Sequence, residues 1–199
     1  MTKLEQSPVQ PTVATYLGNL RDVLVDVPYL AVTRAVELFL EARAAGRRVY
    51  LMGNGGSSAT ASHFVSDLVK TAHVPGFNPV RAFALTDNTP LLTAWANDLA
   101  YERGFAEQIS ALVEPDDIVM GISASGNSPN ILAGLTAAAA CEARTIGLLG
   151  FDGGLARGLV EVPIHIDCGD YGLIEDAHVA VCHAITRAIR TVLLSEAAV

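Results

Sequence analysis

Aromatic and sulfur-containing residues are scarce in this chain, which has one tryptophan, six phenylalanines and three cysteines among 199 residues. The cysteines Cys141, Cys168 and Cys182 are odd in number and show no CxxC spacing, so the sequence predicts neither a disulfide framework nor a cysteine metal site. Each cysteine is expected to be a small buried apolar residue. This pattern is typical of a protein in a reducing cytoplasm.

Other absences exclude further classes of function. Lys and Arg total 13 against 21 Asp and Glu, and they are scattered, so no nucleic-acid partner is expected. No signal peptide is recognisable, and Arg187 and Arg190 interrupt the apolar C-terminus, so no membrane span of ~18 uncharged residues is expected. The dinucleotide and Walker fingerprints are also missing, which argues against a nucleotide ligand. Any anion must therefore be bound by local donors.

Short apolar runs alternate with helical stretches along most of the chain. The runs are almost continuously apolar, as expected for strands buried on both faces, and they span 48–53, 79–85, 117–123, 145–150 and 162–167. Helices are expected between them over 57–72, 89–113 with a break near 97–98, 128–142 and 153–159. This alternation predicts an α/β fold with three layers around a doubly wound, five-stranded parallel sheet.

A single domain is expected over residues 1–199, because no linker, repeat or low-complexity tract divides the chain. Residues 1–11 are interpreted as a loose leader, and 12–45 as a helical hairpin interrupted at 27–30. The α/β core would then occupy 46–199 and end in a long helix over 173–197.

Two loops rich in glycine and serine follow predicted strands and enter predicted helices. They are GNGGSS at 53–58 and SASGNSPN at 123–130. Either loop alone could simply cap its helix. Two such loops at corresponding strand ends favour a small phosphorylated ligand held by hydroxyls, backbone N–H groups and helix dipoles. A third loop over 86–102 carries Asn97 and Asp98, which suit either sugar hydroxyls or ordinary turn chemistry.

Histidines and carboxylates recur at helical spacing in two places. His63 and Asp67 are four residues apart and share one helix face. On the last helix, Glu175 and His183 lie roughly on one face, and His178 is a competing choice for the same cluster. One histidine and one carboxylate from each helix could form a four-ligand nitrogen and oxygen site for Zn²⁺ or a similar divalent ion.

Taken together, these motifs resemble the sugar-isomerase (SIS) domain proteins, and most closely the phosphoheptose isomerases. The resemblance begins near residue 12 and rests on four motifs in order, GNGGSSATASHF at 53–64, LLTAWAND at 91–98, GISASGNSPNIL at 121–132 with GLLGFDGG at 147–154, and IEDAHVAVCH at 174–183. It implies a flavodoxin-like SIS fold and a homotetramer with active sites at subunit interfaces. It also implies a phosphorylated sugar substrate, through interconversion of sedoheptulose 7-phosphate and D-glycero-D-manno-heptose 7-phosphate.

The resemblance also assigns roles to residues. The phosphate would be bound by the serine loop, through Ser123, Ser125 and Ser128, with Ala124 where the family has Thr. The other implied substrate contacts are Asn54, Gly55, Gly56, Ser57, Asn97, Asp98 and Glu175. The implied metal ligands are His63, Asp67, Glu175 and His183, which sets His178 aside.

Several positions depart from the family pattern. Asp67 replaces a Glu, Glu175 replaces a Gln, Asn88 replaces an Asp, and Thr71 stands where the family has an Arg. In the expected mechanism Asp67 moves the carbon-bound proton and His183 moves protons between sugar oxygens through an enediol. Whether Asp67 acts mainly as base or as ligand stays open. The alternatives are an isomerase for a related sugar phosphate and a non-catalytic SIS protein that binds a partner.

Overall fold

The computed structural model describes residues 9–198 and contains one five-stranded parallel sheet. The strands are β1 (Arg48–Gly53), β2 (Arg81–Ala84), β3 (Ile118–Ser123), β4 (Arg144–Leu149) and β5 (Val162–His165), in the spatial order β2-β1-β3-β4-β5. All neighbouring pairs are parallel. The predicted α/β class, strand number and strand direction are confirmed, and the observed strands lie within two residues of the predicted ends.

Side chains of the sheet alternate between two apolar cores, which makes the fold three layers deep. In β1, Val49 and Leu51 face one core, while Tyr50 and Met52 face the other. Because helices cover both faces, each central strand is apolar almost throughout, and this removes the usual alternation from the sequence.

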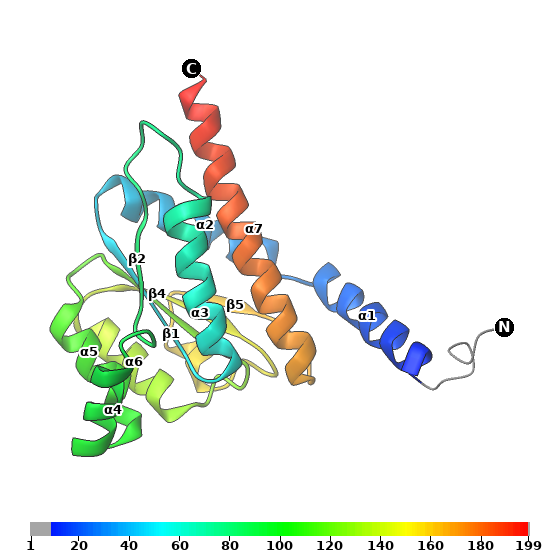
Figure 1. Cartoon of the computed structure of the whole chain (residues 1–199), viewed down its shortest axis with the longest axis horizontal. Coiled ribbons are helices and arrows are strands. Elements are labelled where there is room, and N and C mark those ends of the chain that lie inside the picture. The colour runs from blue at the N-terminus through cyan, green and yellow to red at the C-terminus, as the bar shows by residue number, and fades with distance from the viewer. Residues whose placement is uncertain (1–8, 199) are drawn as a thin grey trace.

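Seven α-helices surround the sheet in the described range. They are α1 (Val9–Val25), α2 (Tyr29–Ala44), α3 (Gly56–Ser66), α4 (Thr89–Asp98), α5 (Gly104–Leu112), α6 (Pro129–Ala140) and α7 (Tyr171–Ala197). Buried residues of α2, α3 and α7 share one core, and those of α5 and α6 share the other. α3 and α7 lie side by side on their face of the sheet (Figure 1). The break expected near 97–98 falls between α4 and a short 3-10 turn at Tyr101–Arg103.

The helix predicted over 57–72 changes its winding part-way. After Ser66 the chain continues as a π-helical turn over Asp67–Thr71, in which the Ala72 N–H donates to the Asp67 carbonyl at 2.8 Å. Apolar periodicity does not distinguish one wide turn from an α-helical turn, so this change of winding could not be predicted. Such turns are rare and are often found at functional sites.

The N-terminal helices differ from the expected hairpin in their packing. α1 begins at Val9, inside the expected leader, whose residues 1–8 lie outside the described range. Figure 1 shows α1 projecting from the body instead of folding back along α2. It contacts the start of α7, where the Tyr16 hydroxyl donates to Asp176 Oδ2 at 2.7 Å. No residue of α1 is buried.

α7 is the one helix in residues 9–198 that is long and apolar enough, by length and composition, to cross a membrane. Its apolar side chains pack inside the protein, because Ala177, Val181, Ile185 and Ile189 are buried in the same core as α2 and α3. α7 is a core helix of the fold.

Candidate functional site

The strand order creates a crevice between β1 and β3, which are neighbours although the chain leaves them toward opposite sides. Ligands of doubly wound sheets bind at such a switch point, outside the carboxyl ends of the strands. A cavity of about 170 Å³ lies there, where β1 ends at Gly53 and β3 ends at Ser123. It is lined by Asn54, Ser57, Ile122, Ser123, Ala124, Ser125, Ser128, Tyr171 and Glu175.

The serine loop gathers three hydroxyls on one side of this cavity. The Gly126 N–H donates to Ser123 Oγ at 3.1 Å, and the Ser123 and Ser128 hydroxyl oxygens lie 3.5 Å apart. Ser128 is the N-cap residue of α6, yet its side chain makes no capping hydrogen bond. Helix capping therefore does not account for the Ser128 hydroxyl, which lines the cavity at the positive end of a helix.

Glycine at 126 is required by two independent constraints. Its φ of +63° favours glycine, and a Cβ there would lie 2.0 Å from the carbonyl oxygen of Gly153. The close approach locks the serine loop against the loop after β4. The serine hydroxyls are thus held on a rigid backbone.

The first glycine-rich loop brings α3 to the opposite side of the cavity. α3 begins after Gly55 with no side-chain cap, and the buried Ser57 lines the cavity. A Cβ on Gly56 would lie 2.5 Å from Glu175 Oε2, so only a glycine lets the carboxylate of α7 approach this closely. The negative charge of Glu175 is favourable there because it faces the N-terminus of α3.

Three candidate metal ligands meet where α3, the π-turn and α7 come together. The Nε2 atoms of His63 and His183 are 3.0 Å apart, and each lies 3.5 Å from Asp67 Oδ2. The histidine side chains are about half exposed, whereas that of Asp67 is 15% exposed. Asp67 Oδ2 is buried and accepts no hydrogen bond, while Oδ1 accepts one from the Thr71 hydroxyl at 3.0 Å.

This His/Asp/His group has the chemistry and the spacing of a divalent metal site. Zn–N and Zn–O bonds of ~2.0–2.1 Å in a tetrahedron place neighbouring ligand atoms ~3.3 Å apart. The three observed separations, 3.0, 3.5 and 3.5 Å, bracket that value. A cation would also satisfy the otherwise unpaired Oδ2 of Asp67. The residues present therefore fit a metal ion.

The fourth predicted ligand does not join this group. Glu175 lines the crevice beside Gly56, while the ligand atoms that lie within 4.8 Å of one another come from His63, Asp67 and His183. His178, the competing choice, is 1% exposed and lies in the protein interior. Burial lowers the pKa of His178 to about 4, an effect only partly offset by the nearby Leu149 carbonyl. It is a neutral core side chain at neutral pH.

Asn97 and Asp98 are exposed at the end of α4 and do not line the crevice. Their side chains bond each other, with Asn97 Nδ2 donating to Asp98 Oδ1 at 2.9 Å. In the described chain these two side chains therefore do not reach the crevice, although they lie on the helix that precedes Tyr101. The next turn brings the Tyr101 hydroxyl to within 2.8 Å of Asn54 Oδ1.

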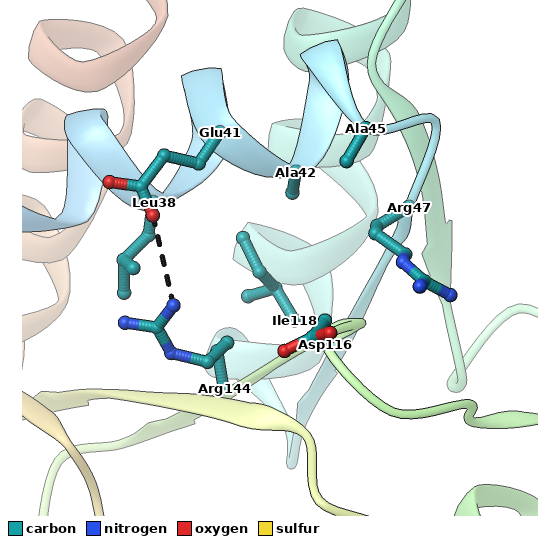
Figure 2. Close-up of a pocket in the computed structure, with 8 residues that line it drawn as sticks. All are labelled: Leu38, Glu41, Ala42, Ala45, Arg47, Asp116, Ile118 and Arg144. Atoms are coloured by element: carbon teal, nitrogen blue, oxygen red, sulfur yellow. Dashed lines mark ion pairs between the residues drawn. The ribbon is translucent and has the colours of Figure 1, made fainter.

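A second cavity lies at the opposite, amino-terminal end of the strands, and Figure 2 shows its lining. Glu41 and Arg144 face each other across it at 3.7 Å, and Arg144 also bonds Glu161. The apolar floor comes from Leu38 and Ile118, among others. Glu41, Arg144 and Glu161 form a structural ion-pair network at this cavity, which lies away from the crevice.

Comparison with known proteins identifies the family of this chain. A family profile described as the SIS domain matches residues 15–150. The phosphoheptose isomerase of Geotalea daltonii is 39% identical over 165 residues, covering 83% of this chain and 85% of that protein. The phosphoheptose isomerase of Syntrophotalea carbinolica is 38% identical over 174 residues, with 86% and 88% covered. The chain belongs to the phosphoheptose isomerase family.

Solved structures of phosphoheptose isomerases share the fold. The enzyme of Neisseria gonorrhoeae superimposes with a TM-score of 0.85 at 28% identity, covering 92% of this chain and 99% of that one. The enzyme of Francisella tularensis gives a TM-score of 0.84 at 27% identity, covering 96% and 100%. The predicted family and its SIS fold are confirmed.

Three polar residues in or next to the crevice were not identified from the sequence. Tyr171 lines the crevice one helical turn before Glu175, so the helix face of Glu175 was a usable signal. Asn130 and Tyr101 both hydrogen-bond Asn54. Nothing local in the sequence signals these contacts, because the partners are 76 and 47 positions away from Asn54.

Proposed function

We propose that the protein is an aldose–ketose isomerase that interconverts sedoheptulose 7-phosphate and D-glycero-D-manno-heptose 7-phosphate. The family relatives support the reaction. The observation that carries the proposal is the juxtaposition of two parts, a hydroxyl-rich loop at a helix N-terminus and a His/Asp/His group on adjoining helices. The first part suits a phosphate and the second suits proton transfer at a sugar carbonyl.

The substrate would lie with its phosphate at Ser123, Ser125 and Ser128. The sugar would extend along Asn54, Gly55, Gly56, Ser57, Ala124 and Glu175, most of which line the crevice. Asn97 and Asp98 are retained as proposed sugar contacts, since Tyr101 connects the segment after α4 to Asn54. All these residues except Glu175 and Asp98 are neutral, so in a chain of net charge −8 the phosphate would be bound by local hydroxyl and N–H donors.

Asp67 and His183 would carry out the proton transfers. Isomerisation removes the proton from one carbon and returns it to the neighbouring carbon by way of an enediol. In this proposal Asp67 moves the carbon-bound proton, and His183 moves protons between the two sugar oxygens, each group contributing ~10²–10⁴-fold. Thr71 orients Asp67 by donating to Oδ1, which leaves Oδ2 facing the two histidines.

His63, Asp67 and His183 would hold one Zn²⁺ per subunit, and Glu175, the fourth ligand predicted from the sequence, would contribute less to its binding because it lies outside their group. Nitrogen and carboxylate ligands suit zinc. Such an ion supplies polarisation of the sugar carbonyl and stabilisation of negative charge on its oxygen. The half-exposed histidine rings leave the group accessible to solvent.

We also infer a homotetramer with interfacial active sites. α1 exposes Val9, Val13 and Leu17, each more than half accessible, and buries no residue against its own chain. Such an apolar helix is stable in water when another chain covers it. The chain would function as a single SIS domain in the cytoplasm, where the free thiols of all three cysteines persist.

Incubation of the purified, zinc-supplied protein with sedoheptulose 7-phosphate, followed by NMR, tests the proposal. Appearance of the aldose supports it, and absence of turnover at enzyme concentrations where the Geotalea daltonii relative reacts would contradict it. Turnover of a different sugar phosphate instead would favour the related isomerase, an outcome consistent with the departures at Asp67, Asn88 and Glu175. Sugar-phosphate binding without any turnover would favour a non-catalytic SIS protein.

A further inference from the structure

Asn54 is the first residue after β1, and its side-chain amide lines the crevice. An amide offers two N–H donors and one oxygen acceptor, so its orientation decides which kind of group a ligand meets. Three hydrogen bonds in the structure determine that orientation. They come from a buried residue on α6 and from a tyrosine beyond α4.

The orientation is set by the backbone of α6. The Ile131 N–H is shared between the Ser128 carbonyl and Asn130 Oδ1, each at 3.0 Å. Because a backbone N–H can only donate, the Asn130 atom that faces it is the oxygen. The Nδ2 of Asn130 is then the atom that donates to Asn54 Oδ1, at 2.8 Å. In return Asn54 Nδ2 donates to Asn130 Oδ1 at 2.9 Å. Asn130 is 1% exposed, so water does not compete for these bonds.

Tyr101 completes the arrangement from the other side. Its hydroxyl donates to Asn54 Oδ1 at 2.8 Å, so that oxygen accepts two hydrogen bonds. Both lone-pair directions of the oxygen are used. One N–H of Asn54 is engaged by Asn130, and no residue of the described range accepts the other. That second N–H is the group left for a ligand in the crevice.

The geometry points to Asn130 and Tyr101 as positioning residues that fix the Asn54 amide, so that it presents a hydrogen-bond donor, and not an acceptor, to a sugar oxygen. The inference rests on the proposed function in that Asn54 contacts the sugar. It gives the buried Asn130 a role at the site although Asn130 does not line the cavity. It also gives the segment after α4 a role at the site, because Tyr101 belongs to that segment.

Binding measurements test the inference without requiring turnover. Calorimetry would compare the affinities of wild type, Tyr101→Phe and Asn130→Asp for sedoheptulose 7-phosphate and for inorganic phosphate. Tyr101 is half exposed, so its variant loses only the hydroxyl and should fold normally. Asn130→Asp keeps the shape of the side chain but replaces its Nδ2 donor by an oxygen that faces Asn54 Oδ1. The repulsion between these two oxygens should free the Asn54 amide to change its orientation.

We expect the Kd for sedoheptulose 7-phosphate to rise about three- to tenfold in Tyr101→Phe and about tenfold or more in Asn130→Asp. In Tyr101→Phe the Kd for inorganic phosphate should not change, because Tyr101 lies outside the serine loop at 123–130. In Asn130→Asp, whose new carboxylate stands at the end of that loop, the loss of sugar-phosphate affinity should exceed the loss of inorganic-phosphate affinity. In turnover assays KM should rise more than kcat falls. The matched control is Tyr29→Phe, which removes another exposed hydroxyl, bonded to the Val25 carbonyl, and should behave as wild type.

A third variant separates donor from acceptor. Asn54→Asp replaces the free N–H by an oxygen and should bind the sugar phosphate more weakly than Asn54→Ala, after correction for any shared loss of inorganic phosphate binding. Unchanged sugar-phosphate affinity in both Tyr101→Phe and Asn130→Asp would overturn the inference, even if the wild type isomerises the heptose. Equal losses for sugar phosphate and inorganic phosphate in Tyr101→Phe would overturn it too. A selective loss of sugar-phosphate affinity would support it even if the wild type shows no turnover.

Discussion

The Nε2 atoms of His63 on α3 and His183 on α7 lie 3.0 Å apart, although the two residues are separated by 120 positions. Two ring nitrogens at this distance cannot both carry a proton without repulsion, so the pair needs either one shared proton or a cation. The Oδ2 of Asp67 lies 3.5 Å from both. This triangle is the feature from which the metal predictions follow.

Removal of either histidine should abolish tight metal binding. Loss of a group that merely orients a ligand already costs ~10–100-fold in metal affinity. We therefore expect His63→Ala and His183→Ala each to weaken Zn²⁺ binding by at least about 100-fold, measured by competition with a chelating dye. His73→Ala, an exposed histidine away from the triangle, is the control. Glu175→Ala should lose much less affinity, and equal loss would place Glu175 among the full ligands.

The serine loop predicts a specific loss of phosphate affinity. A hydrogen bond to a charged group contributes ~1.5–3 kcal/mol, so Ser125→Ala should raise the Kd for sugar phosphate about tenfold or more. Ser110→Ala is a matched control, because the Ser110 hydroxyl bonds the Ala106 carbonyl within α5. Titration calorimetry with inorganic phosphate measures the effect. Equal affinities in the two variants would contradict a phosphate site at this loop.

Burial of His178 predicts a loss of stability in acid. The folded pKa is about 4 and the ordinary value is 6.5, so the unfolded chain binds the proton more readily, and stability falls as the pH drops from 6.5 toward 4. Between pH 7 and pH 5 this group should contribute about 2 kcal/mol of destabilisation. Urea titrations of wild type and His178→Gln at both pH values measure it. A variant with the same pH dependence as wild type would show that His178 is not responsible.

Gly126→Ala should destabilise the protein far more than Gly46→Ala. Both positions have positive φ, +63° and +69°, but an added Cβ meets Gly153 at position 126 and open space at position 46. The backbone strain alone costs ~1–2 kcal/mol, and the steric conflict should add ~1–3 kcal/mol. The free energies of unfolding in urea compare the two variants. Similar losses would show that the Gly126–Gly153 contact relaxes easily.

The exposed helix α1 predicts an assembly that charge can weaken. Val13→Glu combined with Leu17→Glu places carboxylates on its apolar side, and we expect the sedimentation coefficient to shift from that of a tetramer to that of a smaller species. Asn19→Glu adds a charge to the same helix at an exposed polar position and serves as the control. A wild-type protein that sediments as a monomer would rule out the tetramer outright.

The strands and the His63–Asp67 pair were predicted correctly because the constraints on them are local. The strands of the sheet are buried on both faces, so their apolar runs identified them to within two residues. Residue types and spacing also brought out His63 and Asp67, which share a helix face. The π-turn at Asp67 and the open packing of α1 could not be predicted, because neither changes the apolar pattern.

The parts of the site that depend on tertiary contacts were predicted less completely. Glu175 was a candidate for the metal cluster by helical spacing, but its carboxylate lies in the crevice, in the space that the missing side chain of Gly56 leaves open. Asn130 and Tyr101 are connected to the site only by their hydrogen bonds to Asn54, which follows a different strand. Long-range hydrogen bonds of this kind leave no periodicity in a single sequence.

α7 carries both Glu175 in the crevice and His183 in the triangle, on one uninterrupted helix. Eight residues of α-helix rise ~12 Å, and the buried side of α7 prevents that distance from changing. The helix therefore keeps the backbone positions of Glu175 and His183 at a constant separation. In the proposed function, a phosphorylated compound too short to span that separation would not contact both Glu175 and His183, and substrate length would be one basis of selection.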